Sequence, residues 1–114
     1  MTNNIGELGA RYRQLALGWD AAREDPEEAN RLLREQHALY KQMRESTAGR
    51  AAISALLTDE AAAVRLSAAT HSLAWDHERA EKVLEDLQQE SSLLAVDAKW
   101  TLRSFRIGKL DLDW

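Results

Sequence analysis

Helix breakers are rare in this chain of 114 residues, and their rarity limits its folds more than any other feature of the sequence. There is one proline, and the five glycines are scattered rather than clustered. Strand-like alternation of β-branched residues is nearly absent, whereas apolar residues recur every three or four positions, as on one face of a helix. The sequence therefore predicts an all-α protein.

Two helices are expected within residues 1–48. The first begins near Asn4, which suits the capping position, and carries apolar residues at helical spacing. The second begins at Asp25-Pro26, where Asp25 suits the cap and Pro26 the first turn. We expect Gly49 in the turn that follows. The buried stripe of the second helix should comprise Ala29, Leu32, Leu33, Gln36, Tyr40 and Met43.

Shorter helices are expected over residues 50–57, 60–74, 77–89 and 92–107, with Gly108 ending the last one. Connections of two or three residues force neighbouring helices to pack antiparallel. A shift of 29 residues superimposes Val64, Leu66, Ala69 and Leu73 on Leu93, Ala95, Ala98 and Leu102. This internal repeat predicts stacked helix pairs, about six helices in a single domain 1–114, with residues 109–114 as a C-terminal tail.

Residues 56–73 resemble a HEAT-type repeat, whose first helix reads D-x-x-x-V-R-x-x-A-A-x-x-L. Asp59 and Arg65 fall near the acidic and basic positions of that pattern. Residues 97–110 further resemble a small bacterial family of unknown function with HEAT-like helices, so the similarity covers roughly residues 56–110. It implies a short right-handed α-superhelix, with HEAT-like helices over residues 50–108 and the N-terminal pair before them. It implies no catalytic residues. Relatives often stand beside secreted toxins, which suggests an immunity role by analogy.

Composition argues against several classes of function. The net charge is −4 and residues 51–114 have an excess of acidic side chains, which disfavours nucleic-acid binding. Cysteine is absent, which removes disulfides and thiolate chemistry. There is no phosphate-binding loop or membrane-spanning run, and the first residues lack the pattern of a signal peptide. We therefore expect a cytoplasmic protein that is not an enzyme and has no cofactor and no metal.

The three histidines are interpreted as structural. The segment His77-Glu78-Arg79-Ala80-Glu81 resembles a zinc-protease motif but has Glu81 in place of the second histidine, so we expect a solvated first helical turn. His71 shares a face with apolar residues and lacks an evident partner for general-base work. It is interpreted as a hydrogen-bonded packing residue, and His37 is interpreted in the same way.

Two features indicate a binding surface. Residues 76–90 carry six acidic side chains and two basic ones, and Glu78, Glu81 and Glu85 line one helix face, which could steer a basic protein partner. The last helix has a second apolar face with Val96, Trp100 and Ile107, which either the tail or a partner must cover. Trp100 and Trp114 lie on or near this face, and tryptophan is enriched at interfaces.

The leading hypothesis from the sequence is a non-enzymatic protein–protein interaction module, an immunity protein that binds and blocks a cognate bacterial toxin. Its partner-binding residues are expected to be Glu78, Glu81, Glu85, Trp100 and Trp114. The alternative is a homo-oligomeric structural or scaffold protein that buries the face with Val96, Trp100 and Ile107 against a second copy. The sequence leaves the oligomeric state open.

Overall fold

The computed structural model describes residues 4–114, so residues 1–3 of the expected N-terminal helix pair lie outside it. The described residues form six α-helices and one short 3-10 turn, with no strand among them. The all-α prediction is confirmed. The elements are α1 (Ile5–Ala21), α2 (Pro26–Met43), α3 (Thr47–Ala55), η1 (Leu56–Thr58), α4 (Ala62–Ser72), α5 (His77–Leu87) and α6 (Leu93–Arg106).

Side-chain caps fix the starts of the first two helices as the sequence predicted. The Asn4 side chain accepts hydrogen bonds from the backbone N–H groups of Gly6 and Glu7, at 2.8 and 3.4 Å. Asp25 accepts one from the N–H of Glu28 at 3.3 Å, and Pro26 occupies the first helical position. These bonds satisfy N–H groups that have no partner within the helix. The ends of α4, α5 and α6 also lie within about two residues of those expected.

The start of α3 differs from the prediction. α3 begins at Thr47 rather than Arg50, and Gly49 lies inside the helix instead of in a turn. Ser46 caps the helix by accepting a hydrogen bond from the Gly49 N–H at 2.9 Å. Glycine is needed for a different reason, because a Cβ at this position would lie 2.6 Å from the Met43 carbonyl carbon and overlap its oxygen. The glycine therefore permits the close corner between α2 and α3.

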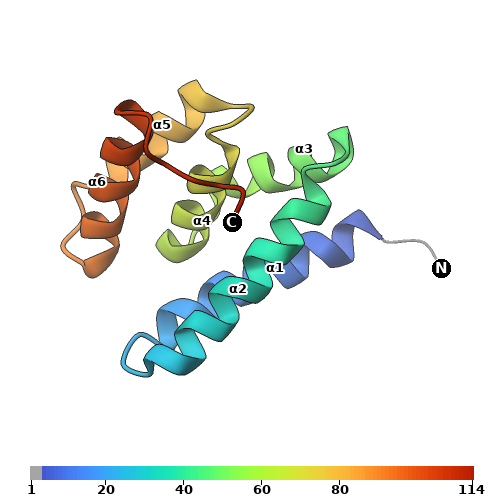
Figure 1. Cartoon of the computed structure of the whole chain (residues 1–114), viewed down its shortest axis with the longest axis horizontal. Helices are drawn as coiled ribbons and strands as arrows, with labels where there is room; N and C mark the ends of the chain where they lie inside the picture. The colour runs from blue at the N-terminus through green and yellow to red at the C-terminus, as the bar shows by residue number, and fades with distance from the viewer. Residues whose placement is uncertain (1–3) are drawn as a thin grey trace.

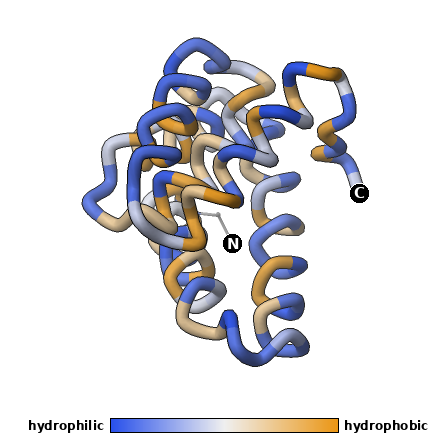
Figure 2. Tube along the Cα trace, turned by 90° about the vertical axis from the view of Figure 1, so that its left-hand side faces the viewer, coloured by the Kyte–Doolittle hydropathy of each residue, from blue (hydrophilic) through white to orange (hydrophobic). Residues whose placement is uncertain are grey.

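The helices form two groups that meet at α4 (Figure 1). α1 and α2 pack against each other as a hairpin, with α3 beside them, and α4, α5 and α6 pack in sequence as neighbours. α4 contacts α1, α3, α5 and α6, so it lies at the centre of the molecule. Figure 2 shows hydrophilic and hydrophobic residues alternating around the turns of the helices, the pattern of amphipathic helices around a shared core.

The core is continuous across both groups of helices. It includes Tyr12, Tyr40, Ile53, Leu84 and Leu102, one from each of α1, α2, α3, α5 and α6. α4 contributes the most, with Ala63, Val64, Leu66, Ala68 and Ala69 all buried. Leu33 was predicted to be buried but is 38% exposed, because it lines an open hollow between α2 and α6.

A left-handed residue ends α6. Gly108 has φ +72°, the only positive φ among the described residues, which confirms the predicted helix stop. The N–H groups of Lys109 and Leu110 both donate to the Ser104 carbonyl, at 2.8 and 3.2 Å. These bonds turn the chain sharply, and the tail then crosses the molecule toward α2 (Figure 1).

Replacing Gly49 by alanine should lower the free energy of unfolding by about 1–3 kcal/mol, the usual cost of forcing an atom into occupied space. Chemical denaturation would measure it. Gly9→Ala is the matched control, because a Cβ there has its nearest neighbour, Ala52, at 4.0 Å. That control should be about 0.5–1 kcal/mol more stable than the wild type through helix propensity. Equal effects at the two glycines would contradict the steric role of Gly49.

Candidate functional site

A cluster of four aromatic and imidazole rings joins the N-terminal hairpin to α4. His71 of α4 stacks on Tyr40 of α2, with ring centroids 4.1 Å apart and planes 10° apart. The His71 Nδ1 lies 2.5 Å from the hydroxyl oxygen of Tyr12 on α1. His37 of α2 is also buried and its ring centroid lies 6.1 Å from that of His71. His71 is thus the hydrogen-bonded packing residue that the sequence predicted.

Burial keeps the His71 imidazole neutral and the Tyr12 hydroxyl protonated. It lowers the pKa of His71 to about 3, and the nearby positive charges of His37 and Arg44 act in the same direction. Burial also raises the pKa of Tyr12 well above 10. At neutral pH the imidazole is therefore neutral and the Tyr12 hydroxyl keeps its proton, so the two groups share one hydrogen bond without a net charge. A base this weak, bonded to a fully buried tyrosine, is poorly suited to proton transfer.

An open hollow of about 200 Å³ lies beside His71, between α1, α2, α4 and α6. Three of its polar side chains form hydrogen bonds within the protein. The Gln36 amide donates to the Tyr12 carbonyl at 3.2 Å and accepts from the Ser67 hydroxyl at 3.3 Å. The Thr70 hydroxyl donates to the Leu66 carbonyl at 2.8 Å. This pattern stabilises the helix contacts and leaves these three side chains already engaged.

His77 lies exposed on the first turn of α5, as expected for a solvated helix start. Within residues 4–114, no group of three or more His, Asp or Glu side chains is placed to hold a metal ion. The same part of the chain contains no helix that is both long enough and apolar enough to cross a membrane.

The acidic face of α5 is largely paired within the molecule. Arg106 of α6 bonds to Glu81 at 3.2 Å through Nε and lies 3.6 Å from Glu85 through Nη2. Glu78 is exposed and has no ion pair within the described residues. The predicted acidic row therefore exists, but Arg106 contacts two of its three carboxylates and offsets one of its three negative charges. Sequence reasoning missed this arginine because the pairing joins two helices.

An exposed apolar row runs along α6, here called the α6 stripe. It consists of Leu93, Val96, Trp100 and Ile107, which are 63%, 51%, 54% and 61% exposed. At about 100° per residue these side chains fall within about 60° of one another around the helix. Lys99 and Arg103 border the stripe, with their charged groups 5.8 and 5.6 Å from the Trp100 ring centroid. The tail leaves this stripe uncovered.

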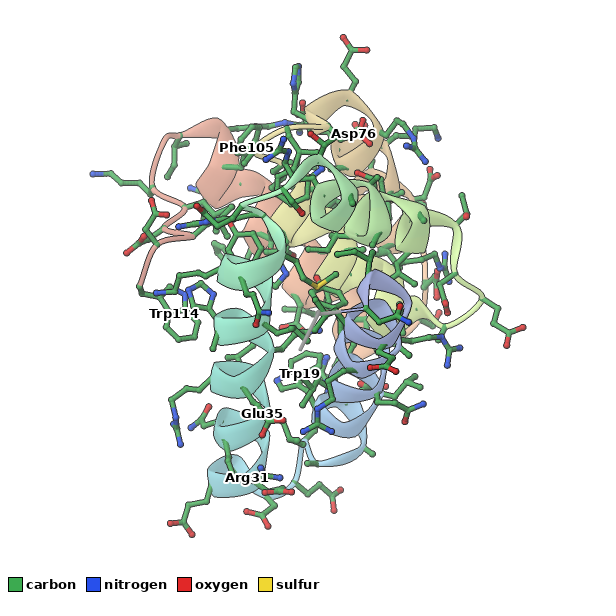
Figure 3. The ribbon with its side chains drawn as sticks, turned by 90° about the vertical axis from the view of Figure 1, so that its right-hand side faces the viewer. Trp19, Arg31, Glu35, Asp76, Phe105 and Trp114 are labelled. Atoms are coloured by element: carbon green, nitrogen blue, oxygen red, sulfur yellow. The ribbon has the colours of Figure 1, made fainter. Side chains whose placement is uncertain are left out.

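Trp114 lies on a different surface from Trp100, although sequence reasoning grouped the two. Its ring stacks on His37 with centroids 3.6 Å apart and planes 4° apart. Figure 3 shows Trp114 against the side of α2. Its carbonyl accepts a hydrogen bond from Lys41 at 2.7 Å, and Arg44 pairs with Asp113 at 2.8 Å. The alternation Leu110-Asp111-Leu112-Asp113 was the available signal for an extended docked segment.

The other two tryptophans, Trp19 and Trp75, are partly buried and pack against the core cluster. The Trp75 indole N–H donates to the Ser54 hydroxyl at 2.9 Å, which satisfies its polar atom.

Comparison with protein-family models, with curated proteins and with solved structures found no match to this chain.

The neutral state of buried His71 predicts how stability depends on pH. Its pKa lies below the value near 6.5 of the unfolded chain, so between about pH 3 and 6.5 the unfolded chain binds more protons. This stability is fully present above pH 6.5 and falls by up to about 1.4 kcal/mol per pH unit as the pH drops through that window. Denaturation curves between pH 7 and 4 would measure it.

His71→Gln keeps an acceptor for Tyr12 but removes the titrating ring, so its stability should depend less steeply on pH over this range. His77→Gln is the control, because it removes an exposed histidine, and it should keep the wild-type slope. An unchanged slope in His71→Gln would assign the acid sensitivity to other groups.

Proposed function

We propose that the protein is a non-enzymatic protein–protein interaction module that binds its partner through the α6 stripe. The observation that carries the proposal is four large apolar side chains, each more than half exposed, three of them on one face of α6 and the fourth, Ile107, directly after its end. Single exposed apolar residues are common on protein surfaces, but a contiguous row rimmed by charges marks an interaction site.

Trp100 is the expected anchor of this interface. It lies in the stripe with Val96 and Leu93 on the turns before it and Ile107 beyond it. Tryptophan contributes disproportionately to binding energy when it is enclosed by apolar neighbours that exclude water. Its indole is already flanked by Lys99 and Arg103, which limits the ring's orientations.

The charges beside the stripe determine the partner's chemistry. Lys99 and Arg103 rim the stripe, so the part of the partner that covers it should carry apolar and acidic side chains. The basic partner expected from the sequence would meet the row Glu78, Glu81 and Glu85, of which Arg106 already engages two. We assign the acidic row a minor, steering role.

The finer form of the proposal is an immunity protein with a HEAT-like superhelical arrangement, which would block a toxin by occlusion. The consecutive packing of α4, α5 and α6 supports the repeat arrangement. The immunity role rests on the resemblance alone.

A photo-crosslinking amino acid at position 96 tests the proposal in the native host. It should give adducts with a different protein, because Val96 lies within the stripe. The same group at Ala51, which is exposed on α3 away from α6 (Figure 1), is the control and should give none. Adducts between two copies of the chain would favour the homo-oligomeric alternative, and no adduct from position 96 would contradict the proposal.

Adding Trp100→Ala to the crosslinking chain should reduce capture of the partner about thirtyfold, as expected when a hot-spot tryptophan worth about 2 kcal/mol is lost. Its melting temperature should stay close to that of the wild type, because the side chain is 54% exposed. Glu78→Lys is the comparison variant, and it should change mainly the dependence of capture on salt. Undiminished capture by Trp100→Ala would remove the stripe from the interface.

A further inference from the structure

The tail docks on the helical body as a peptide ligand would. After Gly108 it has no regular secondary structure through Trp114. Leu110 and Leu112 are half-buried against the core cluster, whereas Asp111 and Asp113 are exposed, although Asp113 pairs with Arg44. This alternation with a period of two is that of an extended segment with one face bound. Figure 2 shows the tail as a separate arm at the edge of the molecule.

The groove beneath the tail recognises main-chain atoms and acidic side chains. Arg44 Nη1 donates to the Leu112 carbonyl at 3.2 Å and pairs with Asp113 at 2.8 Å. Lys41, one turn earlier on α2, donates to the Trp114 carbonyl at 2.7 Å. Contacts to backbone carbonyls do not depend on which side chains the segment carries. The basic residues therefore suit any extended segment with an acidic residue in the place of Asp113.

The tail fills this groove incompletely. An open hollow of about 480 Å³ remains between the tail and the helices. Its walls include Tyr40, Trp75 and Phe105 on the body and Leu110 and Leu112 on the tail. A volume of this size lies in the range of ligand pockets. A segment with aromatic residues in place of the two leucines would bury more apolar surface than the tail does.

The contacts that hold the last two residues of the tail are exposed to solvent. Trp114 is 51% exposed despite its stacking on His37, and the Asp113 side chain is 77% exposed. Ion pairs this exposed are screened by salt. Ile107, Gly108 and Lys109 are all exposed, and a Cβ at Gly108 would meet nothing within 4 Å, so the turn between α6 and the tail is held by the two hydrogen bonds to the Ser104 carbonyl rather than by packing around Gly108.

We propose that the groove formed by α2, the turn between α4 and α5, and α6 beneath residues 110–114 is a second binding site, for an extended acidic and apolar segment of a partner protein. The tail occupies this site as an internal competitor. The segment alternates apolar and acidic residues and ends in an aromatic ring that takes the place of Trp114 on His37. The site is separate from the α6 stripe and does not depend on it.

A labelled peptide tests this directly. The probe is the end-blocked hexapeptide Lys-Leu-Asp-Leu-Asp-Trp, the sequence of residues 109–114, with its binding followed by fluorescence anisotropy. The receptor is the full chain with Leu112→Asp and Trp114→Ala, which weakens the internal tail. This variant should bind at least tenfold more tightly than the wild type, because a tethered tail competes at a high effective concentration. A second probe with phenylalanine at both leucine positions should bind more tightly than the first.

Two controls locate the binding. Arg44→Glu in the same receptor should abolish it, whereas Trp100→Ala should leave it unchanged, which separates this site from the proposed α6 interface. Circular dichroism checks that the receptor keeps its helices, and Trp114→Ala alone is the milder receptor if it does not.

Three results would overturn the proposal. Equal binding to wild type and to the tail variant would place the peptide elsewhere, and so would binding that survives Arg44→Glu. No saturable binding to either receptor would show that the groove holds the tail only. A wild-type dimer that dissociates in Arg44→Glu, seen by light scattering, would make the occupant the tail of a second copy.

Discussion

The contact of His71 with Tyr12 and Tyr40 is the interaction on which the arrangement of the molecule depends. It joins α4 to the N-terminal hairpin, because Tyr12 comes from α1, Tyr40 from α2 and His71 from α4. An apolar side chain at position 71 would leave the buried Tyr12 hydroxyl without its hydrogen-bond partner, which is costly in a protein interior. A charged one would require desolvation of that charge. The neutral imidazole meets both demands and still presents a flat face for stacking.

This cluster also supports the two surfaces that we propose for binding. Tyr40 lies between His71 and Arg44, and its hydroxyl accepts a hydrogen bond from Arg44 at 3.0 Å. The arginine that holds the tail is thus positioned by a ring that belongs to the core. On the other side of α4, Ala98 and Leu102 bury one face of α6, so its opposite face must point outward. The exposure of the α6 stripe follows from the packing of its buried side.

The parts of the structure that sequence predicted well are those determined by neighbours along the chain. Asn4 and Asp25 cap helices through residues two or three positions away, and the periodicity of each apolar face is local. The tail could not be predicted in this way, because Lys41 and the Trp114 carbonyl that it binds are 73 positions apart. The pairing of Arg106 with Glu81 could not be predicted for the same reason, since it depends on how α5 and α6 face each other. Gly49 was misplaced because glycine suggests a turn, whereas here its missing side chain admits the backbone of Met43.

The left-handed turn at Gly108 determines which surface the chain displays and which it hides. The stripe and the groove both adjoin the end of α6. The tail lies in the groove and leaves the stripe exposed. A residue with a side chain disfavours the positive φ of this position. Substitution there would strain the turn that places Leu110 and Leu112 against the body. The exposure of the groove therefore depends on the backbone conformation of Gly108 as well as on the residues that contact the tail.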